Sequence, residues 1–234
     1  MHAALAIPTV DLVIVVDDAS QDDTFERAAY AGAFVVRHKK NHGKGYAMQT
    51  GYRALVAQKG IADATAPYRL LLFIDADLEH SAAQTHVLID PVARGEADLT
   101  IAILPTQQGA AGHGFVVGTA QKTIESLTGW MPTQPLSGMR CMTVAAFTAA
   151  LPLEKGWGVE TGMIIDVLAR GFTIMEVPAQ LQHRASGTSF TDQLHRFGQL
   201  VDVVKVAVPH LLRKKCTHNK QRNIGSSTGN GDAH

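Results

Sequence analysis

The chain has 234 residues, enough for one domain with a substantial core or for two small ones. Hydrophobic residues make up 46% and charged residues 18%, which is typical of a globular protein and excludes a disordered one. Lys plus Arg and Asp plus Glu number 21 each, so no global positive field attracts nucleic acid as a partner.

Strands and helices alternate along the first half of the chain. Apolar runs without polar alternation are typical of strands buried on both faces, and they occur at 12–16 and within the strand expected at 69–74. Further strands are expected at 33–37 and 97–104. Helices are expected between these strands, at 24–31, from the loop 41–45 to about 58, and from the strand at 69–74 to about 94. This alternation predicts an α/β fold with a mainly parallel sheet.

The second half continues the pattern with less regular spacing. A Gly-rich loop at 107–114 is either a flexible connection or a lid over a ligand, and a helix to about 128 follows it. Further along, the sequence predicts a short helix near 143–151, a helix opened by GWGVE at 156–160, and a strand at 172–178.

A long amphipathic helix is expected at 191–212. Packing on the domain or on a second subunit, as in a homodimer, is its ordinary role. The alternative is contact with a membrane surface, because the nearly apolar stretch 206–212 is followed by three basic residues. From 213 to 234 the chain is polar and rich in Gly and Ser, and this tail is expected to be disordered.

The location of the protein is inferred from what the sequence lacks. No apolar run approaches the roughly 20 residues that span a bilayer, and no signal-peptide pattern opens the chain. The two cysteines, Cys141 and Cys216, form no metal-binding or redox motif. We therefore expect a cytoplasmic protein with free thiols, peripheral at the inner face of the membrane if 191–215 binds lipid.

Three acidic residues follow the buried run in LLFIDADLEH (71–80): Asp75, Asp77 and Glu79. Ligands of open α/β sheets bind beyond the carboxyl ends of the strands. Carboxylates this close repel one another unless a cation neutralises them, and Mg²⁺ or Mn²⁺ suits oxygen ligands and completes its shell with substrate phosphates. A turn with Asp77 capping the next helix explains the stretch equally well.

A second acidic strand end occurs at Asp17 and Asp18, after the run at 12–16. Turn and capping chemistry accounts for Ser20 to Thr24, but it accounts less well for two aspartates at the end of a buried strand. One of these carboxylates could accept a hydrogen bond from the N–H of a nucleotide base.

The segment NHGKG (41–45) supplies the opposite charge. Two glycines allow close approach of the backbone to a ligand, Lys44 suits phosphate, and a helix N-terminus follows. The segment is not a Walker motif, and taken alone it is more typical of a solvated turn.

Together, VVDDASQDDT, NHGKGYAMQTG and FIDADLE resemble, in order and spacing, the nucleotide-sugar-binding half of a GT-A glycosyltransferase of the family 2 type. In the second half, QPLSGMR, GWGVETGMIID and HRASG are similar to glucosyl-3-phosphoglycerate synthases. FIDADLE and the R-x-x-G-x-S beginning at Arg184 also resemble polyprenyl-phosphate sugar synthases. The resemblance covers roughly 3–205. It implies one GT-A domain at 1–212, comprising a nucleotide-binding half (1–105), an acceptor half (106–190) and the C-terminal helix.

The resemblance implies a metal site. Asp75 and Asp77 match the D-x-D that holds Mg²⁺ or Mn²⁺ and the donor diphosphate, with Asp77 as the more direct ligand. Glu79 matches a third ligand of the polyprenyl-type enzymes. His183 matches a histidine that completes the metal site in the phosphoglycerate-type enzymes, and Arg184 matches its basic neighbour. Taken alone, His183 is more typical of a structural histidine.

The resemblance also implies donor and acceptor contacts. Lys44 matches the lysine of the nucleotide pocket, and Glu160 matches an acid near the sugar and the acceptor. Taken alone, Glu160 could simply occupy the first turn of a helix. The uridine-contacting turn is matched by Asp17, Asp18 and Ser20. The loop against the donor sugar and acceptor is matched by Leu136, Ser137 and Gly138.

One departure from the family concerns its first strand, which ends in a P-x-x-N-E type motif and is central in the GT-A sheet. This chain opens with HAALAIPTVDL instead. We therefore expect a gap between the strands LVIVV and LLLFI, with unpaired backbone, an open core and reduced nucleotide affinity. An internal start, a degenerate protein, or another segment that fills the gap would each account for it.

The expected function is that of a metal-dependent glycosyltransferase that moves a sugar, with glucose favoured, from a UDP-sugar to an acceptor such as phosphoglycerate. In an inverting reaction Glu160 would be the base, and in a retaining one it would orient the acceptor or sugar. The alternatives are a polyprenyl-phosphate sugar synthase at the membrane surface and a non-catalytic remnant. A nucleotidyltransferase is less favoured because its N-terminal Gly-rich loop and activating lysine are absent.

Overall fold

The computed structural model describes residues 1–58, 69–105, 113–154 and 156–181. His183, Arg184, the helix expected at 191–212, the tail and most of the Gly-rich loop lie outside the described residues. Within them, no helix has the length and apolar character needed to cross a membrane.

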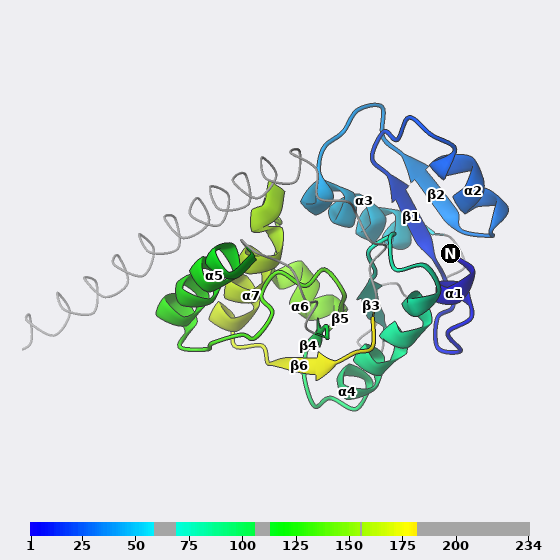
Figure 1. Ribbon diagram of the computed structural model, residues 1–234. Helices are drawn as coiled ribbons and strands as arrows, with labels where there is room; N and C mark the ends of the chain where they lie inside the picture. Colours follow the sequence, from blue (N-terminus) through cyan, green and yellow to red (C-terminus); the bar gives the residue numbers. More distant parts are fainter. Residues whose placement is uncertain (59–68, 106–112, 155, 182–234) are drawn as a thin grey trace, which may run out of the picture.

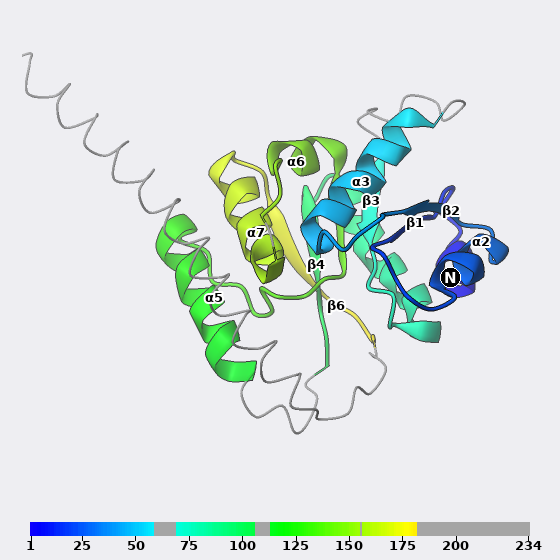
Figure 2. The same ribbon diagram turned by 90° about the horizontal axis from the view of Figure 1, so that it is seen from above.

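The N-terminal part forms a small parallel unit. β1 (Ile14–Asp17) and β2 (Phe34–Arg37) pair in parallel, and α2 (Thr24–Tyr30) connects them. The left-handed Gly32, with φ of 92°, ends the connection and turns the chain into β2. α3 (Lys44–Ala57) packs against β1, as Figures 1 and 2 show.

A four-stranded sheet forms the centre of the molecule, in the order β3-β5-β4-β6. β3 (Leu70–Phe73), β4 (Leu99–Ile103) and β6 (Ile174–Pro178) run in one direction, while β5 (Arg140–Thr143) is antiparallel to both of its neighbours. The expected α/β fold is confirmed, and β5 is the exception to its mainly parallel strands.

Helices cover both faces of this sheet. Alternate residues of a strand point to opposite faces, so Cys141 joins the core beneath η1 (Glu79–Leu88) and α4 (Ile89–Ala93), whereas Met142 joins the other core. That second core is built by α5 (His113–Thr128), α6 (Val144–Ala149) and α7 (Val159–Ala169), which follows the single turn η2 (Gly156–Gly158). Burial on both faces explains the continuous apolar runs in the sequence.

The helix expected directly after β3 differs in type from the expectation. η1 is a 3₁₀ helix, and only α4 is α-helical. The hydroxyls of Ser81 and Thr85 each donate a hydrogen bond to the carbonyl three residues back, which belongs to Leu78 and Ala82 respectively. Such side-chain bonds compete with α-helical pairing and favour the tighter turn. A short helix, α1 (His2–Leu5), packs against η1.

A gap separates the two sheets. In the described part of the chain, β1 pairs only with β2 and β3 pairs only with β5, so the second edge of each strand lacks a partner. Cavities of about 810 and 370 Å³ lie between them, and both are lined by Ile14 and Val16 of β1 and by Leu70 and Leu72 of β3. The gap expected between these two strands is therefore present. The ion pair of Arg69 Nη1 with Asp11 Oδ2, at 2.7 Å, links the strands at their N-terminal ends.

Candidate active site

Three charged side chains from distant parts of the sequence meet at the candidate site. Lys44 opens α3, Asp75 follows β3, and Glu160 lies in the first turn of α7. The Lys44 Nζ lies 2.8 Å from Asp75 Oδ1 and 2.9 Å from Glu160 Oε1. Burial lowers the pKa of Lys44, but the carboxylates of Glu160 and Asp75 outweigh this effect and raise the pKa above its ordinary value. Lys44 is therefore a fixed cation at neutral pH.

The backbone of Gly138 lies directly against this charged pair. A Cβ at this position would clash with the carboxylate of Asp75 and with the ammonium of Lys44. Glycine allows this approach without displacing either side chain, so the turn before β5 lies close to the two charged groups. Ser137 beside it is buried, and its hydroxyl has no hydrogen-bond partner among the described residues.

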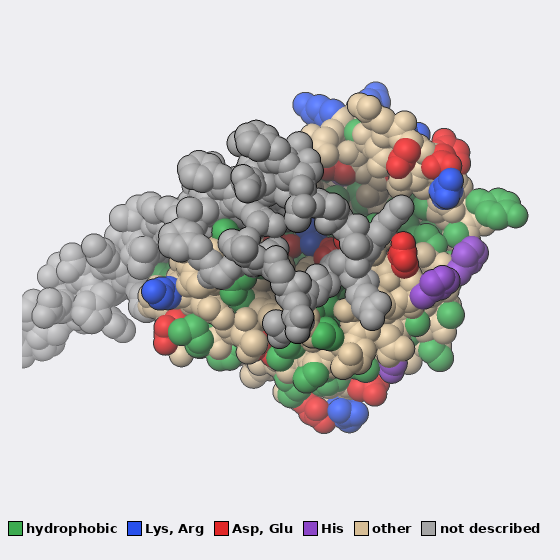
Figure 3. All heavy atoms as spheres, viewed as in Figure 1, with side chains coloured by type: hydrophobic (Ala, Val, Ile, Leu, Met, Phe, Trp, Pro, Cys, Tyr) green, Lys and Arg blue, Asp and Glu red, His purple; other side chains and the backbone are tan. Residues whose placement is uncertain are grey.

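A cavity opens from these groups toward the gap in the sheet. The cavity of about 370 Å³ is lined by Lys44, Asp75 and Gly138 at one end and by residues of β1 and β3 along its length. On the face shown in Figure 3, a basic side chain flanked by acidic ones lies in a hollow near the centre. The charged site and the gap are thus continuous.

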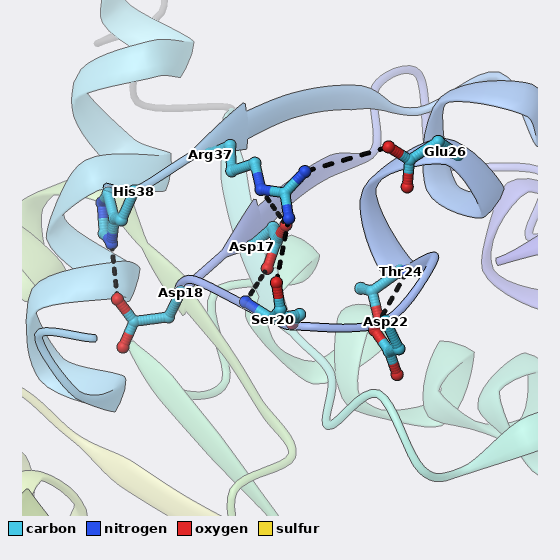
Figure 4. A network of polar contacts seen from close by, with 8 residues as sticks. All are labelled: Asp17, Asp18, Ser20, Asp22, Thr24, Glu26, Arg37 and His38. Carbon is cyan, nitrogen blue, oxygen red and sulfur yellow. Dashed lines mark hydrogen bonds and ion pairs between the residues drawn. The ribbon is translucent and has the colours of Figure 1, made fainter. Parts of the chain in front are cut away.

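The two aspartates at the C-terminal end of β1 point in different directions, as Figure 4 shows. Asp17 is buried, accepts a hydrogen bond from the amide of Ser20 at 2.8 Å, and forms an ion pair with Arg37 at 3.1 Å. Hydrogen bonding from Ser20 lowers the pKa of Asp17 despite its burial. This part of the turn is fixed by its own side chains.

Asp18 instead anchors the loop that precedes α3. Its carboxylate accepts hydrogen bonds from the amides of His42 and Gly43 at 2.9 and 2.7 Å, and His38 Nδ1 lies 2.6 Å from it. Burial raises the pKa of Asp18, but the bonds from His38 and the two amides outweigh burial and lower it. The observed contacts of Asp18 are therefore with the chain itself, and they position the start of the helix that carries Lys44.

The acids beyond Asp75 are more exposed. Asp77 and Glu79 lie at the surface, and Glu79 has a left-handed backbone with φ of 48°. Within the described ranges, no three acidic, His or Cys side chains come together as a metal cage. The carboxylates of Asp75 and Asp77 still fit Mg²⁺ or Mn²⁺ as ligands, because these ions prefer oxygen ligands and Mg²⁺ typically takes only one or two protein carboxylates.

Comparison with known proteins identifies the family. The family model described as "Glycosyl transferase family 2" matches residues 2–140, more than half of the chain. The chain belongs to glycosyl transferase family 2. This membership agrees with the resemblance carried by the motifs around Asp17, Lys44 and Asp75.

Individual curated proteins resemble the chain at low identity. Glucosyl-3-phosphoglycerate synthase of Mycolicibacterium paratuberculosis is 29% identical over 184 residues, covering 69% of this chain and 52% of the relative. Glycosyltransferase AglJ of Haloferax volcanii is 27% identical over 184 residues, covering 75% of this chain and 55% of the relative. The chain thus spans about half the length of these curated relatives.

A solved structure of a related synthase superposes on most of the chain. Glucosyl-3-phosphoglycerate synthase from Mycobacterium tuberculosis, in complex with Mn²⁺, UDP-glucose and phosphoglyceric acid, matches with a TM-score of 0.65 and 27% identity. The match covers 85% of this chain and 69% of that one. The α/β fold is therefore that of the solved structures of this synthase.

The structure brings together only some of the residues singled out from the sequence. Lys44, Asp75, Gly138 and Glu160 converge, and Ser137 and the half-buried Leu136 flank them. The turn of Asp17 to Ser20 is ordered by its own contacts, and Asp77 and Glu79 lie beyond the convergence. Sequence reasoning missed Arg140, although an arginine inside the apolar segment GMRCMTV was a signal for a buried cation.

Proposed function

We propose that the protein is a metal-dependent glycosyltransferase that moves glucose from UDP-glucose to phosphoglycerate or a similar acceptor. The observation that carries the proposal is the position of the Lys44 ammonium between Asp75 and Glu160, with Gly138 packed against it. Further support comes from the solved structure of the mycobacterial synthase, which contains Mn²⁺, UDP-glucose and phosphoglyceric acid.

On the donor side, the chain offers one cation and two carboxylates. Asp75 and Asp77 would hold a divalent ion, which would offset the negative charge of the diphosphate and of the departing UDP. Lys44 is fixed beside Asp75 by two ion pairs, so its charge requires little reorganisation when phosphate oxygens arrive. Asp17 and Ser20 lie at the end of β1 and are proposed to contact the uridine, while Asp18 positions the loop before Lys44.

On the acceptor side, Glu160 is buried at the N-terminus of α7 and faces Lys44. In an inverting reaction it would take the proton of the acceptor hydroxyl, and in a retaining one it would orient that hydroxyl or the sugar. The turn of Leu136, Ser137 and Gly138 is proposed to lie against the sugar. His183 and Arg184 are proposed to complete the metal site.

Calorimetric titration of UDP, with Mn²⁺ and then with EDTA, tests the donor site. We expect binding that requires the metal and is lost in Asp77→Ala, because the diphosphate and the carboxylate share the ion. Asp90→Ala is the matched control, since Asp90 is an exposed carboxylate on α4. A folded protein without metal-dependent UDP binding would instead favour a non-catalytic remnant.

The acceptor is tested by UDP release in the presence of 3-phosphoglycerate or of a polyprenyl phosphate in vesicles. The alternative of a polyprenyl-phosphate acceptor rests on the amphipathic and basic sequence of 191–215. Release that depends on phosphoglycerate, without co-sedimentation with anionic vesicles, supports the proposal. Vesicle-dependent release would contradict it and support the alternative.

A further inference from the structure

Arg140 is a buried cation that the proposed chemistry does not use. It lies on β5, directly after the turn that carries Gly138, and only 1% of its surface is exposed. Its guanidinium donates three hydrogen bonds to backbone carbonyls. Nε donates to Ser137 at 2.9 Å, Nη2 to Pro135 at 2.9 Å, and Nη1 to Glu160 at 3.0 Å.

These bonds join two segments that are far apart in the sequence. Two of the carbonyls belong to the turn before β5, and the third belongs to the first turn of α7. The turn places Gly138 against Asp75 and Lys44, and the helix places the Glu160 carboxylate against the same lysine. A single side chain therefore ties together both backbone segments that border the charged site.

Burial of this cation is costly, and no carboxylate within the described part of the chain lies close enough to pair with it directly. Burial lowers the pKa of Arg140 to about 10, and the more distant charges of Glu160 and Asp75 oppose that shift. The guanidinium thus stays protonated at neutral pH. An apolar side chain could fill the same space without this cost, so packing alone does not explain an arginine here.

We propose that Arg140 is a positioning residue, which fixes the 135–138 turn and the start of α7 relative to each other so that Gly138 and Glu160 meet Lys44. The effect of this positioning on sugar transfer rests on the proposed function. Three carbonyls are bound through three different nitrogens of one planar group. Lysine carries its donors on a single nitrogen and would not span both segments.

The test compares Arg140→Lys and Arg140→Met with Thr100→Val. Met is included because hydrophobic replacement of a buried charged group is often tolerated by the fold. Thr100 is the control, since it is buried on the neighbouring β4 and donates to the carbonyl of Leu88 at 2.7 Å. Its variant loses a buried hydrogen bond of the same sheet without contacting the turn.

Hydrogen exchange of the unliganded protein gives a readout that needs no activity. In both Arg140 variants we expect the amides of 136–139 and 160–162 to exchange at least about tenfold faster, the effect of losing one charge-assisted hydrogen bond. Thr100→Val should leave those segments unchanged. Equal protection in all three variants, or faster exchange spread over the whole sheet in the Arg140 variants, would overturn the proposal.

Steady-state transfer then measures the catalytic consequence. We expect kcat to fall about tenfold or more in Arg140→Lys, while the Kd for UDP with Mn²⁺ changes less than about threefold. A decrease in kcat no larger than that of Thr100→Val would mean a purely structural role. If the unaltered protein transfers no sugar, the proposed function fails, and hydrogen exchange still decides whether Arg140 fixes the two segments.

Discussion

Gly138 shows how one absent side chain shapes the site. The Asp75 carboxylate and the Lys44 ammonium occupy the space that a Cβ at residue 138 would need, so the ion pair lies directly against the turn. Lys44 also pairs with Glu160, so its ammonium cannot withdraw from Gly138 without weakening one of its two ion pairs. The position therefore tests whether close approach of the turn matters for binding.

We predict that Gly138→Ala weakens metal-dependent UDP binding by about tenfold or more and destabilises the fold by about 1–3 kcal/mol, as overpacking typically does. Isothermal titration and urea unfolding measure the two effects. Gly118→Ala is the matched control, since a Cβ there meets open space on α5 and alanine favours a helix. Equal UDP affinity in the two variants would mean that the turn has room to move.

At the scale of elements, Asp18 links β1 to α3. Its carboxylate accepts hydrogen bonds from the backbone amides of His42 and Gly43, the two residues that lead into the helix of Lys44. Hydrogen bonds to the ionised form stabilise it, which is why the pKa of Asp18 is lowered in spite of burial. The protonation state of this carboxyl group is therefore coupled to the stability of the loop.

We predict that Asp18→Asn lowers the free energy of unfolding at pH 7 by about 1–3 kcal/mol, because charge-assisted bonds are lost. Because the pKa of Asp18 is lower in the folded protein than its ordinary value of 3.8, the ionised carboxylate stabilises the fold above that pH. This stabilisation is lost as pH falls through the lower pKa of the folded state. The difference between variant and parent should therefore shrink below about pH 4. Urea unfolding from pH 3 to pH 7 measures this difference in the free energy of unfolding, and the exposed Asp90→Asn is the control. A difference that does not change with pH would contradict the role of the Asp18 carboxylate.

The elements also show what the sequence could and could not predict. Apolar runs predicted β1, β3 and β4, although only β4 is almost wholly buried, because β1 and β3 border the gap. β5 was missed, since this short strand begins with the charged Arg140 and the partners of that guanidinium are set by tertiary structure. Likewise, the order of acids at 75–79 did not reveal that Asp75 meets Lys44 while Asp77 stays exposed.

At the scale of the whole molecule, the gap divides the fold into parts of unequal stability. Two-stranded sheets are marginal by themselves, and the β1–β2 unit is held mainly through α3, whereas both faces of the four-stranded sheet carry a core. The elements that carry Asp17 and Lys44 therefore belong to the weaker part. Under the proposed function, local opening of this part would reduce the apparent affinity for the donor.

We predict that closing the gap strengthens both folding and donor binding. An N-terminally extended version with an apolar strand that pairs with β1 and β3 should raise the midpoint of thermal unfolding by about 5 °C or more and tighten UDP binding. The reason is that the strand would pair with the edges of β1 and β3 that have no partner within the described residues, and would fill the cavities between Ile14 and Leu72. The same extension with two prolines in the strand is the control, because proline cannot donate to a sheet. Equal stability and UDP affinity in all three proteins would mean that the gap has no bearing on the site, and that the affinity is set locally around Lys44.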